Sequence, residues 1–80
     1  MSKKRLHLTF PEDLITEPVI YNMGKRFEVV TNIRRANVEE HSGWVILEAH
    51  GQQDQLDGAI AYFEGLGCTV NRMEGDVLES

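Results

Sequence analysis

Two histidines and one carboxylate are the side chains of this sequence that could bind a metal ion together. His7 lies in one short segment of alternating apolar and polar residues, and Glu48 and His50 lie in another. If these segments form neighbouring antiparallel strands, we expect His7 and His50 to lie close together on one face, and imidazole and carboxylate groups are zinc ligands. No metal-motif spacing joins the three residues, so ordinary cross-strand pairing is the simpler interpretation and no metal is expected.

The residue types that carry covalent catalysis form no motif. The sequence has no glycine-rich phosphate loop and no nucleophile elbow, and Ser42 falls in a predicted turn. Cys68, the single cysteine, is predicted on the apolar side of a strand, where its thiolate is disfavoured. One cysteine cannot form an internal disulfide or hold an iron–sulfur cluster alone. We therefore expect a protein that binds, without a cofactor, and not an enzyme.

The composition indicates one small globular domain. Eighty residues, 41% of them hydrophobic, build a single core, and so small a core gains from association with a second copy. The net charge of −5 disfavours nucleic acid, and no apolar run reaches the roughly 18 residues that span a membrane. Basic residues at 3–5 are not followed by the apolar run of a signal peptide, so a cytoplasmic location is expected.

Hydrophobic periodicity predicts a two-layer domain. Strands are expected at residues 5–10, 29–40, 44–50 and 68–73, and amphipathic helices at residues 18–27 and 53–66. This order predicts an α+β fold of the ferredoxin-like βαββαβ type, a four-stranded antiparallel sheet with both helices on one face. We expect a single domain over residues 1–80, with an ordered core at about residues 5–74 and flexible tails.

Four residues refine the two helices. Thr16 is the predicted N-cap of the first helix, and Gly67 suits the left-handed position that ends the second. Gly24 and Gly58 lie inside the helices, where each costs roughly 1 kcal/mol relative to alanine. Close packing between the helices and their neighbours is the expected offset.

The second strand is expected to be irregular. Ile33 and Val38 are an odd number of positions apart, so burial of both requires a β-bulge, which we expect near Arg35 and Ala36. Asn32 interrupts a β-branched run in which asparagine is disfavoured. It is either a ligand contact or the cap of a local turn at the bulge.

The other face of the predicted sheet has no helix to cover it. Strand alternation places Trp44, Ile46 and Met73 on that face. A contiguous apolar patch of this kind usually marks an interface or a ligand site. The expected homodimer would bury part of the face around Trp44.

Several short segments follow one family pattern, in register and without large gaps from about Arg5 to Met73. They are Leu8-Thr9-Phe10, Glu17-Pro18-Val19, Asn32-Ile33-Arg34-Arg35-Ala36-Asn37-Val38, Gly43-Trp44, Gly51, Ala59-Ile60-Ala61-Tyr62 and Gly67-Cys68-Thr69-Val70. The pattern resembles the NIL domain, the ACT-like C-terminal regulatory domain of methionine-importer ATPases. The resemblance implies a ferredoxin-like fold that pairs with a second copy and binds methionine, so that a replete cell stops uptake.

Five residues are expected to form the ligand site, and the resemblance marks the first of them: Asn32, Ile33, Arg34, Trp44 and Ile46. The signature asparagine of the family corresponds to Asn32, which would hydrogen-bond the polar end of the ligand. Arg34 stands where the family has leucine, and it could either alter an apolar wall or meet a ligand carboxylate. Ile33, Trp44 and Ile46 would line or support the site.

Two functions follow, from different classes. With no ATPase in the sequence, we expect a stand-alone NIL protein that senses methionine or a related sulfur amino acid as a homodimer and acts on a separate protein. The alternative is a ligand-free adaptor that docks a sulfur-metabolism or transport partner through the face around Trp44. An RNA-binding sheet needs several stacking aromatic residues and a basic face, which one tryptophan and an acidic chain do not provide.

Overall fold

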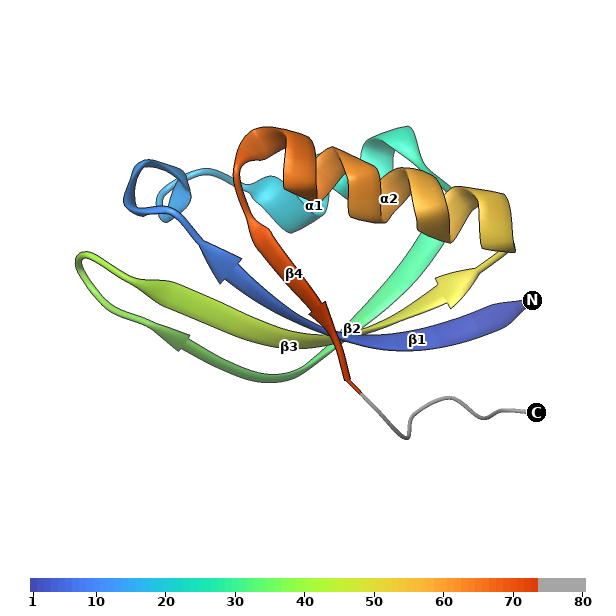
Figure 1. Ribbon diagram of the computed structural model, residues 1–80, viewed down its shortest axis with the longest axis horizontal. Coiled ribbons are helices and arrows are strands. Elements are labelled where there is room, and N and C mark those ends of the chain that lie inside the picture. Colours follow the sequence, from blue (N-terminus) through green and yellow to red (C-terminus); the bar gives the residue numbers. More distant parts are fainter. Residues whose placement is uncertain (74–80) are drawn as a thin grey trace.

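The structure, a computed structural model, describes residues 1–73 as a four-stranded sheet with two helices on one of its faces (Figure 1). Its elements are β1 (Ser2–Phe10), a 3-10 turn (Glu12–Leu14), α1 (Val19–Arg26), β2 (Val29–Val38), β3 (Gly43–Gly51), α2 (Gln53–Leu66) and β4 (Thr69–Arg72). All neighbouring strands are antiparallel, in the order β2-β3-β1-β4. The predicted ferredoxin-like fold is confirmed. Residue 74, the predicted end of the core, and the C-terminal tail lie outside the described residues.

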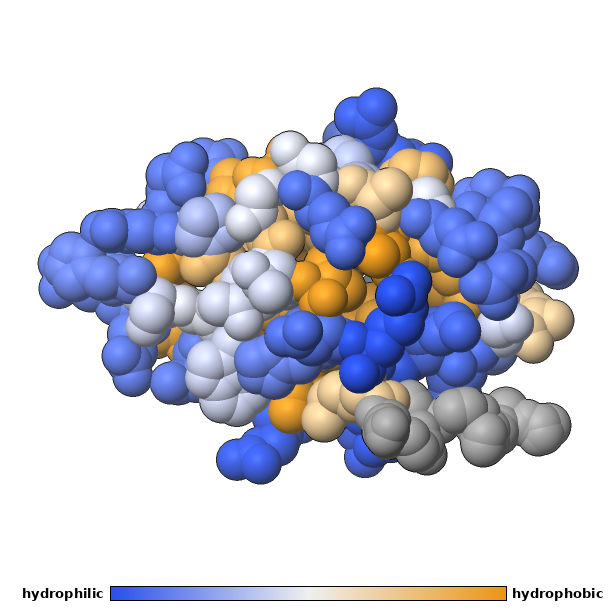
Figure 2. Space-filling model, in the orientation of Figure 1, coloured by the Kyte–Doolittle hydropathy of each residue, from blue (hydrophilic) through white to orange (hydrophobic). Residues whose placement is uncertain are grey.

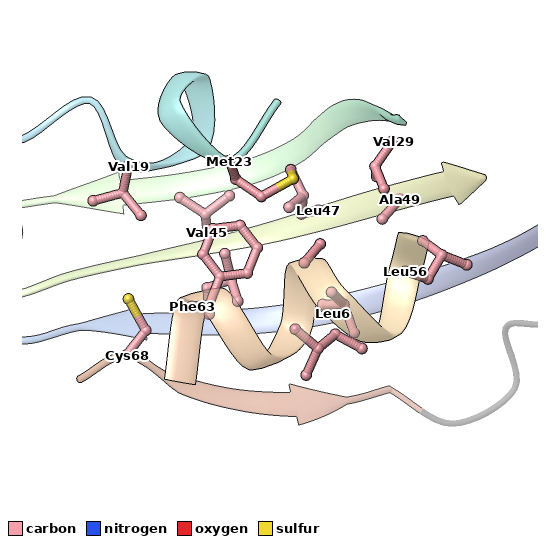
Figure 3. Close-up of a cluster of buried hydrophobic side chains, with 13 residues drawn as sticks. Leu6, Val19, Met23, Val29, Val45, Leu47, Ala49, Leu56, Phe63 and Cys68 are labelled. Atoms are coloured by element: carbon pink, nitrogen blue, oxygen red, sulfur yellow. The ribbon is translucent and has the colours of Figure 1, made fainter. Parts of the chain in front are cut away.

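The core lies between the sheet and the helices. Alternation along the two central strands sends Leu6 and Leu8 of β1, and Leu47 of β3, toward the helices, where each is almost fully buried. Figure 3 shows Met23 of α1 and Phe63 of α2 pointing toward the same strands. Each such side chain stabilises the fold by roughly 1.5–3 kcal/mol through burial.

The first helix begins later than its predicted cap. Thr16 does not cap this helix, because it still belongs to the turn that follows the 3-10 helix. In that turn the Glu17 N–H donates a hydrogen bond to the Leu14 carbonyl at 3.0 Å. The residue at the N-cap is Pro18, and no side chain caps this helix. At the end of α2 the prediction is confirmed, since Gly67 has φ 105° and its N–H bonds to the Glu64 carbonyl at 3.0 Å.

A bulge interrupts β2 at Arg34, one residue before the predicted place. Ile33 lies opposite Leu47 and Arg35 opposite Ile46, which leaves Arg34 as the extra residue. The expectation that Ile33 and Val38 are both buried was wrong, because these side chains are 54% and 61% exposed. The helices cover only the start of this edge strand, where Val29 is buried, and leave the rest of it to solvent.

The two helical glycines differ in their surroundings. A Cβ atom on Gly58 would lie 2.5 Å from Cε1 of Phe27, so the Phe27 ring packs directly on the α2 backbone. Around Gly24 there is open space, with nothing within 4 Å of a Cβ position. Close packing therefore explains the glycine in α2 and gives no reason for the one in α1.

Candidate functional site

An apolar groove of about 210 Å³ opens on the helix side of the sheet, beside the start of α1. It lies where the ends of β1 and β2 extend past the helix. The lining residues come from five parts of the chain: Phe10, Leu14, Ile15, Glu17, Pro18, Val19, Ile20, Tyr21, Val38, Gly43 and Val45. Among them Glu17 is the one residue with an ionisable carboxyl group, so the groove is suited to an apolar group.

The groove exists because α1 is shorter than the strands beneath it. The helix has eight residues and β2 has ten, and the hairpin of β2 and β3 projects beyond the helical layer. The hairpin tip is tied to the 3-10 turn across the groove's end, since Nδ1 of His41 lies 2.5 Å from Oε2 of Glu12. Both side chains are exposed, so this contact positions the tip and adds little stability.

The opposite face of the sheet, which we call the open face, carries the tryptophan. The rings of Trp44 and His7 stack with centroids 5.3 Å apart and an interplanar angle of 19°. The predicted closeness of His7 and His50 is wrong, because His7 lies opposite Ile46 whereas His50 lies opposite Lys3. In residues 1–73, no group of three or more His, Cys, Asp or Glu side chains could hold a metal ion.

Glu48 is the centre of an ion-pair network on the open face. Nη2 of Arg5 donates a hydrogen bond to Oε2 of Glu48 at 3.1 Å, and Nη1 of Arg34 lies 3.7 Å from Oε1. The hydrogen bond from Arg5 is the main cause that lowers the pKa of Glu48 below 4.5; the charges of Arg34 and Lys3 act in the same direction, against partial desolvation. Glu48 is therefore ionised at neutral pH.

A shallow hollow of about 250 Å³ lies beside this network. Arg5, Arg34, Arg35, Ile46 and Met73 line it. It combines guanidinium groups with two apolar side chains. Figure 2 shows apolar colour reaching the lower edge of the molecule, on the side of the sheet away from the helices.

The five predicted ligand residues lie on two faces of the sheet. Asn32, Arg34, Trp44 and Ile46 are on the open face, whereas Ile33 points to the helix side, opposite Leu47. Arg34 and Ile46 share the hollow; Asn32 lies opposite Glu48 and is exposed. In residues 1–73 the Asn32 side chain makes no hydrogen bond, so the turn-capping alternative finds no support.

Sequence reasoning missed the groove. Its walls include Leu14, Ile15 and Ile20, which stand on either side of Pro18 and were assigned to a turn and to one face of a helix. The available signal was the number of apolar residues in that short connection. Alternation also assigned Val38 to the helix side of the sheet, but it could not show that α1 does not reach far enough to cover this residue.

Cys68 is not a reactive thiol in this setting. Its side chain is buried beside α2, and burial raises the pKa of the thiol. Separately, no helix in residues 1–73 is long and apolar enough to cross a membrane.

The sheet order and helix placement define a ferredoxin-like α+β domain. The chain belongs to the NIL domain family, which its sequence matches over residues 4–72. Among solved structures, it is similar to the crystal structure of the C-terminal domain of an ABC transporter ATP-binding protein from Enterococcus faecalis. That likeness has a TM-score of 0.77 and 17% identity, covers 91% of this chain and 86% of the other, and shows a shared fold. No curated protein sequence matches this chain.

Proposed function

We propose that this chain is a regulatory domain that binds a small apolar amino acid, methionine or a related sulfur amino acid, and that it is not an enzyme. Membership of the NIL domain family and the fold shared with a transporter ATPase's C-terminal domain support a regulatory role. The observation that carries the proposal is the apolar groove between the start of α1 and the β2–β3 hairpin.

The size and chemistry of the groove favour a single amino-acid side chain. Pockets for drug-sized ligands enclose about 300–1,000 Å³, and about 210 Å³ is below that range. Its apolar walls favour a thioether or aliphatic group over a charged one. The exposed Glu17 carboxylate lines the groove and is a partner for a ligand ammonium group. At the start of α1 the Val19 N–H already donates to the Glu17 carbonyl at 2.8 Å, which leaves the N–H groups of Ile20 and Tyr21 without an acceptor inside the helix.

A thermal-shift series tests this proposal. Methionine, homocysteine, cysteine and leucine are compared with glutamate and lysine; a ligand at a hundred times its dissociation constant adds about 2.7 kcal/mol of stability. Val38→Asp places a charge in the groove, and Val30→Asp is the matched control, since Val30 is also an exposed valine of β2 but lies outside the groove. We expect Val38→Asp to weaken binding about ten-fold or more, which is 1.4 kcal/mol or more, and Val30→Asp to leave it unchanged.

Asn32→Ala distinguishes ligand binding in the groove from ligand binding at the site that the family resemblance implies. Asn32 lies on the open face, so its truncation leaves a ligand in the groove of the same chain untouched. If Asn32→Ala abolishes binding and Val38→Asp does not, the ligand binds on the open face and the groove assignment is wrong. If no amino acid shifts the melting temperature, the proposed function is wrong.

The proposed assembly is a cytosolic homodimer that pairs along the outer edge of β2. In residues 1–73 no strand lies beside that edge, which is ten residues long, whereas β4 at the other edge has four. Pairing through the face around Trp44 is disfavoured, because it would bring Arg34 and Arg35 of both copies together. We expect Ile33→Lys, at the β2 edge, to halve the mass found by light scattering, and Trp44→Ser to leave it unchanged; the reverse result would place the interface on the open face.

A further inference from the structure

The open face has a charge opposite to that of the whole chain. Of the strand residues that point away from the helices, four are cations, Lys3, Arg5, Arg34 and Arg35, and one is an acid, Glu48. Four cations against one carboxylate leave a formal charge of +3, whereas residues 1–73 as a whole, with eight Lys and Arg and ten Asp and Glu, carry −2. Glu39 reaches this face at its hairpin end, where its Oε2 accepts a hydrogen bond from Asn37.

The bulge in β2 concentrates this charge. In a regular strand two consecutive residues point to opposite faces, but Arg34 and Arg35 both line the hollow on the open face. The single carboxylate of Glu48 contacts both Arg5 and Arg34. In residues 1–73 no carboxylate lies within ion-pair distance of Arg35, so this guanidinium is available to a partner from outside.

Apolar groups lie beside the cations. Ile46 and Met73 line the same hollow as the arginines, and Trp44 lies two residues along β3 from Ile46. Cations beside aliphatic and aromatic side chains on one face complement a strand-like segment that presents both carboxylates and aliphatic residues on a single side, at every second position. A wholly charged ligand would leave these apolar groups unpaired.

We propose that the open face binds an acidic segment of another protein, one whose carboxylates meet Arg34 and Arg35 and whose aliphatic side chains pack on Ile46 and Trp44. This site is on the opposite side of the sheet from the amino-acid groove and does not depend on it. A second copy of the chain is a poor occupant, because the same positive surface would face itself. Single-stranded nucleic acid is also a poor one, since His7 already covers one face of the Trp44 ring, on which a base would stack, and the net charge opposes a polyanion.

The fluorescence of Trp44, the only tryptophan of the sequence, gives a direct binding assay for this face. The probe is a peptide of about 12 residues with the repeat Asp-Ser-Leu-Ser, which places Asp and Leu on the same side of an extended strand and spans about 40 Å, against a longest domain extent of 38 Å. Peptides with the repeats Lys-Ser-Leu-Ser and Asp-Ser-Ser-Ser test the charge and the aliphatic residues separately, and oligothymidylate tests nucleic acid. We expect the first peptide alone to bind well, and more weakly as salt is added.

A pair of double variants locates the interaction. Arg34→Gln with Arg35→Gln removes two cations from the open face, and Lys25→Gln with Arg26→Gln removes two from α1 on the other side of the sheet. We expect the first pair to weaken peptide binding about ten-fold and the second to leave it unchanged, with both proteins folded by circular dichroism.

Four results would overturn the proposal: no binding of the acidic peptide, equal binding of the lysine peptide, tighter binding of oligothymidylate, or equal loss in both double variants. None of these results affects the amino-acid test, whose decisive variant, Val38→Asp, lies in the groove on the helix side. The two proposals can therefore fail separately.

Discussion

Replacing the two helical glycines by alanine should have different effects on stability: the change should stabilise the domain at Gly24 and should not at Gly58. Alanine is favoured over glycine in a helix by about 1 kcal/mol. At Gly24 the new methyl group meets open space, so Gly24→Ala should stabilise the domain by about 0.5–1 kcal/mol. At Gly58 the same gain is opposed by a collision with Phe27.

The size of that collision follows from the distances. The added Cβ would lie 2.5 Å from Cε1 and 3.0 Å from Cδ1 of Phe27, and carbon atoms pack best at about 3.5–4.0 Å. The ring must therefore move by about 1 Å, which disturbs its edge-to-face packing with Tyr62, whose ring centroid lies 6.1 Å away. Overpacking of this kind costs about 1–3 kcal/mol, so we expect Gly58→Ala to range from neutral to about 2 kcal/mol destabilising.

Urea unfolding followed by far-UV circular dichroism measures both variants under one set of conditions. The expected difference in stability between the two variants is about 0.5–3 kcal/mol, and each 1 kcal/mol shifts the melting temperature of a domain this size by about 4–8 °C. Phe27→Leu should relieve the collision, so that Gly58→Ala costs less in that background. Equal stabilisation by the two alanines would show that Phe27 does not pack on Gly58, and the reasoning would be refuted.

Three further predictions concern single side chains. The pKa of Glu48 is lowered in the folded state, so the stability that this carboxylate contributes is present above its unfolded pKa and is lost as the pH falls through the folded pKa. Glu48→Gln should therefore flatten the acid side of a stability profile measured by urea unfolding from pH 7 to pH 3. Cys68 should react slowly with a thiol reagent in the native protein and rapidly in denaturant, and equal rates would contradict its burial. Thr16→Ala should cost less than about 0.5 kcal/mol in thermal unfolding, because Thr16 caps no helix; a loss of about 1 kcal/mol or more would restore the capping interpretation.

Much of the fold could be predicted because its signals are local. Alternation along β1 and β3 reflects burial of one face, and Leu6, Leu8 and Leu47 are nearly inaccessible, as that pattern requires. Gly67 was identified for a similarly local reason, since a left-handed residue after a helix favours glycine.

The parts that could not be predicted depend on how far one element extends over another. The groove forms because α1 ends before the strands beneath it do, and no local pattern gives that length. His7 stacks on Trp44 and does not lie near His50 because of the register between β1 and β3. Alternation does not determine this register, since a shift by two residues keeps every side chain on the same face. The positive charge of the open face was hidden by the net charge of the chain, which sums over all 80 residues.

The bulge at Arg34 has a consequence for sequence alignment. One additional residue in a strand normally exchanges its two faces from that point onward, but the bulge absorbs it, so Val38 still faces the groove. Deleting Arg34 would leave every other residue of β2 on its present face and produce a regular strand. Relatives with a regular second strand should therefore be one residue shorter at this position. An alignment that puts the gap elsewhere would assign groove residues to the wrong side of the sheet.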